Sequence, residues 1–134
     1  MNLKKQGQYG EKLACNFLLS KKYSIVSTNY YYKNYEIDII AKKEEIYIAV
    51  EVKLRSVPFI VSPFDSVGKF KQAKIIQVMN RYVQTNAINK EVRFDIISIV
   101  LFEDSYKIEH LKNAFYPSLS IWVIFVDQYE NKCL

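Results

Sequence analysis

The sequence is poor in the residues that interrupt a folded chain. Its 134 residues include only three glycines and three prolines, and no Gly/Ser-rich or Pro-rich stretch divides one part from another. Half of the residues are apolar, which suffices for the core of one domain of this length. We therefore expect one globular domain.

Cysteine and histidine are too scarce to hold a soft metal ion. Cys15 and Cys133 lie far apart in sequence and form no C-x-x-C pair, and His110 is the only histidine. This scarcity argues against a zinc site. If the protein uses a metal, we expect a hard cation held by carboxylates, which means Mg²⁺ or Mn²⁺.

Long apolar runs are also missing. The longest uninterrupted run covers residues 121–126, far short of the roughly 20 residues that span a bilayer as a helix. The lysines at the start of the chain are not followed by the apolar segment of a signal peptide. We expect a cytoplasmic protein without membrane contact.

Positive charge is present in excess and is unevenly distributed. Residues 1–90 contain fifteen Lys and Arg against seven Asp and Glu, whereas residues 91–134 contain four against seven. A basic segment of this kind attracts a polyanion through Coulomb forces and counterion release. The charge alone leaves a merely soluble basic protein equally open.

Hydrophobic periodicity predicts an α/β fold in the order α-β-β-β-α-β-β, a mixed sheet flanked by helices. Gly7 and Gly10 at the start of the first helix suggest either a late helix onset or the close approach of another backbone. Asp65 or Ser66 is the expected cap of the second helix. The predicted helices cover residues 4–20 and about 66–84, the antiparallel strands 23–32, 35–41 and 46–53, and the later strands 92–102 and 106–111, with the first of these two parallel to an earlier strand.

Charged residues interrupt two of the apolar strands. Because strand side chains alternate between faces, Glu36 and Asp38 share one face, as do Glu51 and Lys53. If residues 43–46 form the hairpin loop, Asp38 falls opposite Glu51 and Glu36 falls opposite Lys53. Two opposed carboxylates repel each other unless a cation lies between them.

Two carboxylates beside a lysine suit metal-dependent hydrolysis of a phosphodiester, in which the carboxylates hold the ion and the lysine offsets developing charge. Glu11 is a candidate third carboxylate, because its place beside the apolar stripe of the first helix turns it toward the sheet. The alternative interpretation is an exposed strand face whose charges form ordinary cross-strand ion pairs.

Three other groups of residues have simpler interpretations. The tyrosines 30–32 and Tyr35 could stack on unpaired bases, but packing is the favoured role. Arg93 and Asp95 share a strand face and are expected to pair with each other or with a neighbouring charge. His110 is expected to be a core or surface residue and not a general base.

Taken together, these motifs resemble those of the bacterial YraN-like family over about residues 7–116. The matching segments are G-x-x-G-E at 7–11, E-I-D-I-I at 36–40, V-E-V-K-x-R at 50–55, the lysines near 69–74 and R-F-D at 93–95. That family is similar to Holliday-junction resolvases and to the PD-(D/E)XK nuclease superfamily. The chain departs from the pattern at Tyr35, where the family usually has glycine.

The resemblance implies a restriction-endonuclease-like domain at 1–116, followed by an extension of unknown role at 117–134. It implies that Asp38, Glu51 and Glu11 bind Mg²⁺ or Mn²⁺ and act in catalysis together with Lys53. It also implies that Arg55 and either Lys71 or Lys74 contact nucleic acid.

The implied function is a Mg²⁺-dependent endonuclease for DNA, with branched or flapped DNA as substrate and a homodimer as a possible assembly. One alternative is a nucleic-acid-binding module without turnover on the same fold. Another is a protein-interaction domain whose charges are structural.

Overall fold

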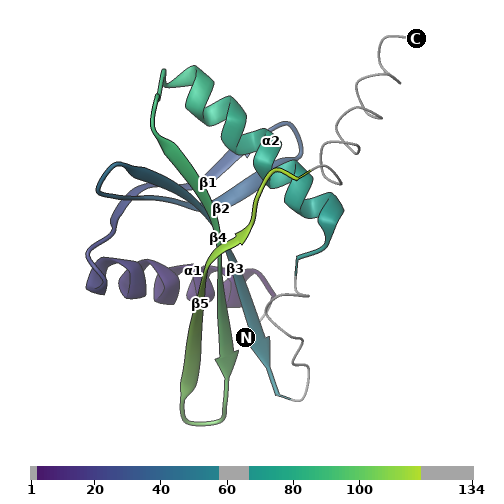
Figure 1. Cartoon of the computed structure of the whole chain (residues 1–134). Helices are drawn as coiled ribbons and strands as arrows, with labels where there is room; N and C mark the ends of the chain where they lie inside the picture. Colours follow the sequence, from purple (N-terminus) through teal and green to yellow (C-terminus); the bar gives the residue numbers. More distant parts are fainter. Residues whose placement is uncertain (1–2, 58–66, 119–134) are drawn as a thin grey trace.

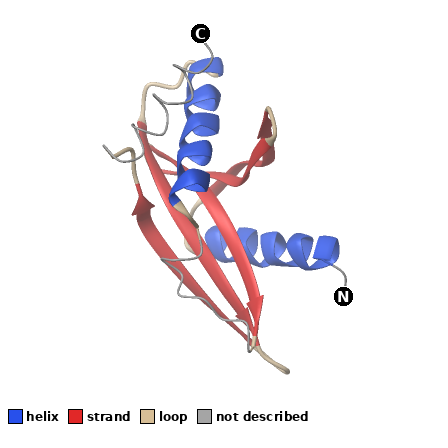
Figure 2. Ribbon diagram, turned by 90° about the vertical axis from the view of Figure 1, so that its right-hand side faces the viewer, coloured by secondary structure: helices blue, strands red, loops and turns tan. Residues whose placement is uncertain are grey.

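The computed structural model describes residues 3–57 and 67–118, in which two helices flank a five-stranded sheet (Figures 1 and 2). The predicted element order is confirmed. The elements are α1 (Leu3–Ser20), β1 (Ser24–Tyr32), β2 (Tyr35–Lys43), β3 (Ile46–Ser56), α2 (Lys69–Thr85), β4 (Glu91–Leu101) and β5 (Tyr106–Phe115). None of the described helices is long and apolar enough to cross a membrane.

The strands lie in the order in which they occur in the chain. β1, β2 and β3 form the predicted antiparallel meander, and β5 pairs antiparallel with β4 at the sheet edge. β3 and β4 are parallel, which confirms the prediction for residues 92–102. Parallel neighbours need a crossover connection, and α2 supplies it (Figure 1).

The β2–β3 hairpin has the predicted register but a shorter turn. Lys42 pairs with Tyr47 as expected, and Lys43 also pairs with Ile46, so the predicted four-residue loop is wrong and only Glu44 and Glu45 form the turn. Glu44 adopts a positive φ of 56°, the left-handed conformation that tight hairpin turns require.

The boundaries of two other elements differ from the prediction. α2 begins at Lys69 with Gly68 as its N-cap and without a side-chain cap, so the predicted cap is wrong; Asp65 and Ser66 lie outside the described residues. β5 continues past Leu111 to Phe115 because a register shift absorbs the polar pair 112–113, where Asn113 has a positive φ of 53°.

The sheet buries apolar side chains on both faces. Phe94 and Ile96 of β4 pack in a cluster with α2, whereas Ile97 and Ile99 pack in a second cluster with α1. Two covered faces explain why β4 reads as an almost continuous apolar run. Gly10 allows one of these contacts, because a Cβ atom there would lie 3.3 Å from Cβ of Leu54 in β3. Because α1 begins at Leu3, the predicted late helix onset is wrong. The alternative, close approach of another segment, occurs at Gly10, where the nearest atoms belong to the Leu54 side chain, and not at Gly7, where nothing lies within 4 Å.

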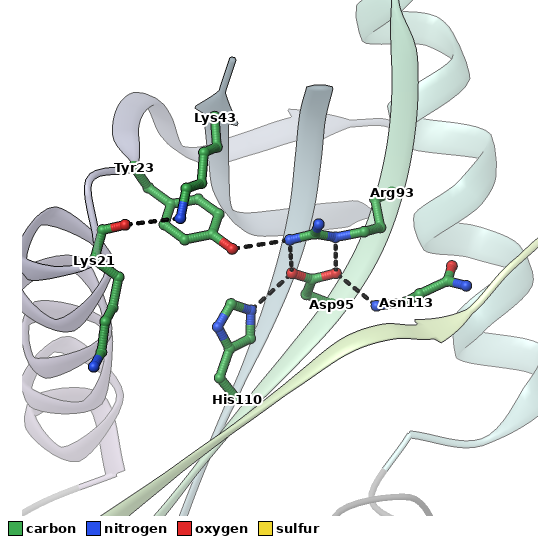
Figure 3. Close-up of polar contacts among 7 residues, drawn as sticks. All are labelled: Lys21, Tyr23, Lys43, Arg93, Asp95, His110 and Asn113. Carbon is green, nitrogen blue, oxygen red and sulfur yellow. Dashed lines mark hydrogen bonds and ion pairs between the residues drawn. The ribbon is translucent and has the colours of Figure 1, made fainter. Parts of the chain in front are cut away.

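A buried polar network joins β4 to β5 and to Tyr23 in the connection between α1 and β1 (Figure 3). The Arg93 guanidinium donates two hydrogen bonds of 2.9 Å to Asp95 and one of 3.0 Å to the Tyr23 hydroxyl. Nε2 of His110 lies 2.7 Å from Oδ2 of Asp95, and the Asn113 N–H donates to Oδ1. The predicted Arg93–Asp95 pair is confirmed, and His110 is a core residue bound to it.

Burial alone raises the pKa of Asp95, but the contacts with His110, Arg93 and Asn113 outweigh burial and leave the pKa lowered. Asp95 is fully buried and charged, and each side chain in contact with its carboxylate comes from β4 or β5. We assign this network a structural role, because its polar groups satisfy one another.

Candidate functional site

A pocket of about 330 Å³ lies where α1, β2, β3 and α2 meet. Its lining is rich in charge: the acidic members are Glu11, Glu36, Asp38 and Glu51, and the basic members are Lys53, Arg55 and Lys71. Carboxylates thus come from one helix and two strands, and a lysine comes from the second helix. These charged residues are up to sixty positions apart in sequence.

The pocket opens where β2 and β3 part. Their ladder runs from the hairpin turn to the pair Ile39 and Val50, one position short of Asp38 and Glu51. Beyond that point the Val52 N–H donates a 2.8 Å hydrogen bond to Oδ2 of Asp38. The Asp38 side chain thus accepts the hydrogen bond that a carbonyl of the neighbouring strand would otherwise accept. This hydrogen bond holds the Asp38 carboxylate between the separating strands.

Three carboxylates crowd together on the α1 side of the pocket. Oxygen atoms of Glu11, Glu36 and Asp38 lie within 4.8 Å of one another. The Asn29 amide of β1 donates to Glu11 at 3.0 Å and to Glu36 at 3.5 Å, so a neutral donor links two of the three. The expected position of Glu11, facing the sheet, is confirmed.

Burial and crowding disfavour the charged form of these groups. Burial, and next the charge of Glu51, raises the pKa of Asp38 to about 8, although the Val52 N–H opposes the shift. Burial also raises the pKa of Glu11, against the effect of Asn29 and with a contribution from Glu36. A hard dication among these oxygens would remove the repulsion, so the donor set fits Mg²⁺ or Mn²⁺.

Glu51 has a different environment from the other three carboxylates. It is 4% exposed, and its Oε1 lies 2.6 Å from Nζ of Lys71 and 3.5 Å from Nζ of Lys53. Burial disfavours the charged form of the Lys71 ammonium, but the attraction of the Glu51 carboxylate outweighs burial, so the pKa of Lys71 is raised. Burial and the nearby Lys71 lower the pKa of Lys53. One carboxylate oxygen therefore contacts two ammonium groups.

Six of the seven residues singled out from the sequence line this pocket: Glu11, Asp38, Glu51, Lys53, Arg55 and Lys71. Lys74 does not, because its ammonium lies over the rings of Tyr35 and Phe70. The choice between Lys71 and Lys74 as the pocket lysine therefore falls on Lys71. The metal-binding or catalytic roles of the first four and the nucleic-acid contacts of Arg55 and Lys71 remain predictions.

Glu36 was not among the residues predicted for the site and was expected opposite Lys53. That expected pairing is wrong, since Lys53 pairs with Glu51 and Glu36 joins Glu11 and Asp38. The cause is the parting of β2 and β3, which ends the hairpin register before it reaches Glu36. The available signal was the i, i+2 spacing of Glu36 and Asp38 on one strand face.

Fold and pocket together define a mixed α/β domain with a carboxylate- and lysine-lined pocket between two diverging strands. The chain belongs to the uncharacterised protein family UPF0102, whose model matches residues 10–99. This result confirms the resemblance to YraN-like proteins.

Relatives from distant bacteria align over almost their whole length. A UPF0102 protein of Clostridioides difficile is 47% identical over 116 residues, which cover 86% of this chain and 100% of the relative. One from Flavobacterium psychrophilum is 44% identical over 110 residues, which cover 82% of this chain and 92% of the relative. One from Parabacteroides distasonis is 40% identical over 110 residues, which cover 82% of this chain and 91% of the relative. The family model covers the charged residues of the pocket, from Glu11 to Lys71.

Proposed function

We propose that the protein is a Mg²⁺-dependent endonuclease that hydrolyses phosphodiester bonds of DNA, with branched or flapped DNA as its substrate, in the cytoplasm. The observation that carries the proposal is the meeting of Glu11, Glu36 and Asp38 within 4.8 Å, in the same pocket as Lys53. A crowded carboxylate group next to an ammonium is the arrangement expected for metal-assisted attack on a phosphate.

The carboxylates of Asp38 and Glu11 would hold the ion, together with Glu36 or Glu51. When bound, Mg²⁺ supplies polarisation of the phosphate and a bound water of lowered pKa. Mn²⁺ would be accepted by the same oxygen ligands. Glu51 would join this set through a carboxylate whose Oε1 already contacts Lys71 at 2.6 Å.

The cationic side chains have separate tasks in this proposal. Lys53 lies inside the pocket, where its ammonium offsets the negative charge that develops on the phosphorane. Lys71 holds the Glu51 carboxylate in place, because it binds the same oxygen that Lys53 approaches. Arg55, at the end of β3, contacts a phosphate of the DNA backbone.

A homodimer would supply two such pockets for the two strands of a branched junction. We extend the proposal to that assembly because of the resemblance to junction resolvases, which is an analogy of fold and motif. Sedimentation of the protein with and without a branched DNA measures it: two protein chains per junction support the dimer, and one chain argues against it.

The direct test is cleavage of labelled branched, flapped and single-stranded DNA with Mg²⁺ and with EDTA. We expect metal-dependent cleavage by the natural protein and at least about a hundredfold loss in Asp38→Ala and Lys53→Ala. Lys107→Ala, which alters an exposed lysine of β5, should cleave normally. Cleavage that survives both pocket substitutions would exclude this pocket as its source.

A binding module without turnover is the second candidate, and the contact between Glu51 and Lys71 favours it, since an internal ion pair already neutralises one carboxylate. Binding of nucleic acid that survives Asp38→Ala and Lys53→Ala, with no cleavage by any variant, would support this alternative. Unchanged mobility of every nucleic acid at low salt would instead favour a protein-interaction domain.

A further inference from the structure

Outside the pocket, aromatic rings and cations alternate along the surface formed by α2 and the β1–β2 hairpin. Nζ of Lys74 lies 5.2 Å from the ring centroid of Phe70 and 5.3 Å from that of Tyr35. The two rings are 6.4 Å apart and inclined by 66°. Lys74 is therefore held between two aromatic side chains, one from the helix and one from β2.

The same pattern recurs further along α2. The Arg81 guanidinium lies 5.3 Å from the ring centroid of Tyr32, and Nζ of Lys33 lies 5.5 Å from the same ring. Phe70 and Arg81 are eleven positions apart, which is roughly 16 Å along a helix. We call Tyr32, Tyr35, Phe70, Lys74 and Arg81 the α2 ridge.

The charge and exposure of the ridge fit an anionic partner with flat apolar groups. α2 contains four basic residues, Lys69, Lys71, Lys74 and Arg81, and no Asp or Glu. Phe70 is 53% exposed, although the same helix buries six other side chains. The protein core therefore leaves much of the Phe70 ring uncovered. The positive charges of α2 around the ring disfavour an apolar protein partner.

The ridge begins beside the pocket. Phe70 is followed directly by Lys71, whose ammonium contacts Glu51 and which lines the pocket. The first turn of α2 thus contributes one side chain to the ridge and the next to the pocket. A strand bound along the ridge would therefore reach the pocket at this turn.

We propose that the α2 ridge binds an unpaired nucleic-acid strand, with a base stacked on Phe70 and phosphates beside Lys74 and Arg81. Bases in a duplex stack on one another, whereas an unpaired base offers a free face to an aromatic ring. The inference deepens the proposed function, on which it rests, because it names the substrate as DNA with a single-stranded segment that leads into the pocket.

Binding is tested without cleavage, in EDTA and at fixed salt, by fluorescence anisotropy. The probes are a labelled unpaired strand of about 12 nucleotides and a duplex of the same length. Phe70→Ala should weaken binding of the unpaired strand at least about fivefold and leave the duplex unchanged. The matched control is Phe102→Ala in the β4–β5 turn, since Phe102 is similarly exposed, at 44%, and should have no effect.

Phe70→Trp gives a second readout that loss of folding cannot imitate. This variant should retain binding, and its added fluorescence should be quenched by the unpaired strand, while Phe102→Trp should not respond. Equal binding by the natural protein and Phe70→Ala, without quenching in Phe70→Trp, would overturn the proposal. Equal quenching by the duplex would also overturn it, because the ridge would then be a surface for double strands.

The two proposals can fail separately. Selective binding of the unpaired strand through Phe70 supports the ridge even if no variant cleaves DNA with Mg²⁺, in which case only the proposed hydrolysis fails. Metal-dependent cleavage of branched DNA with no contribution from Phe70 to strand binding would support the hydrolysis and contradict the ridge.

Discussion

Nζ of Lys71 lies 2.6 Å from Oε1 of Glu51, so the second helix supplies a cation to a strand carboxylate that is only 4% exposed. Oxygen atoms of the other pocket carboxylates, Glu11, Glu36 and Asp38, lie within 4.8 Å of one another. The pocket thus has a side that is already balanced by cations and a side that a dication would balance.

Removal of Lys71 should destabilise the protein through Glu51. Lys71→Met leaves Glu51 with Lys53 alone, at 3.5 Å, and we expect a loss of about 1–3 kcal/mol in the free energy of unfolding. Urea unfolding in EDTA measures it. The control is Lys90→Met, which breaks an equally short pair with Glu45 on the surface and should change stability little, because water screens that pair. An equal effect of both variants would contradict a special role for Lys71.

Asp38 should make the metal-free protein less stable as the pH rises. Its pKa is raised to about 8 in the folded protein, against roughly 3.9 in the unfolded chain. The contribution of Asp38 to the free energy of unfolding is therefore complete below about pH 3.9 and is lost as the pH rises toward 8. Asp38→Asn keeps an acceptor for the Val52 N–H and should raise the free energy of unfolding at pH 8 by about 1–3 kcal/mol.

The same pair of proteins tests the metal. Mg²⁺ should stabilise the natural protein at pH 8 and have little effect on Asp38→Asn, as followed by the shift in Tm. Asp104→Asn, a change in the β4–β5 turn, is the control and should respond to Mg²⁺ like the natural protein. A stability of the natural protein that does not depend on pH between 5 and 8 in EDTA would argue against a carboxylate with this raised pKa.

Asp95 should have the opposite dependence on pH. Its pKa is lowered, so its contribution is complete above the unfolded pKa of roughly 3.9 and is lost as the pH falls through the native value. Asp95→Asn should cost about 2–4 kcal/mol at neutral pH, because Arg93 and His110 lose a charged partner inside the protein. Urea unfolding from pH 7 to 3 should show the two proteins converging at low pH; a constant difference would be inconsistent with this account.

Two glycines of α1 should respond differently to alanine. Nothing lies within 4 Å of a Cβ atom at Gly7, so Gly7→Ala should stabilise the helix by about 0.5–1 kcal/mol. A Cβ atom at Gly10 would lie 3.3 Å from Cβ of Leu54, so Gly10→Ala should lack this gain and Gly10→Val should cost about 1–3 kcal/mol. Thermal unfolding compares the variants, and an equal gain from both alanines would contradict the close approach of α1 and β3.

Local pattern was sufficient for the elements and the sheet. The apolar alternation in residues 35–53 indicated β2 and β3, and the dense apolar run of β4 indicated a strand covered on both faces. Turn details were not accessible, since Glu44 has no special propensity for the left-handed conformation that shortens the hairpin.

The sequence predicted which residues line the site better than it predicted the contacts among them. Charges within apolar strands indicated Asp38, Glu51 and Lys53. The parting of β2 and β3, and the position of Glu36 beside Glu11 of α1, are tertiary features that strand periodicity does not indicate. Two further contacts join residues that are distant in sequence: the Lys74 ammonium lies over the Tyr35 ring, and His110 contacts Asp95. Tyr30 packs against Tyr82, as the packing interpretation of the tyrosines expected.

A crystal grown at neutral pH and soaked in Mn²⁺ tests the central claim most directly, because the anomalous signal of the metal locates it independently of activity. We expect a peak bound by Asp38 and Glu11, with Glu36 or Glu51 completing the protein ligands, and its loss in Asp38→Ala. A pocket without metal at saturating Mn²⁺, or a peak confined to other residues, would contradict the account.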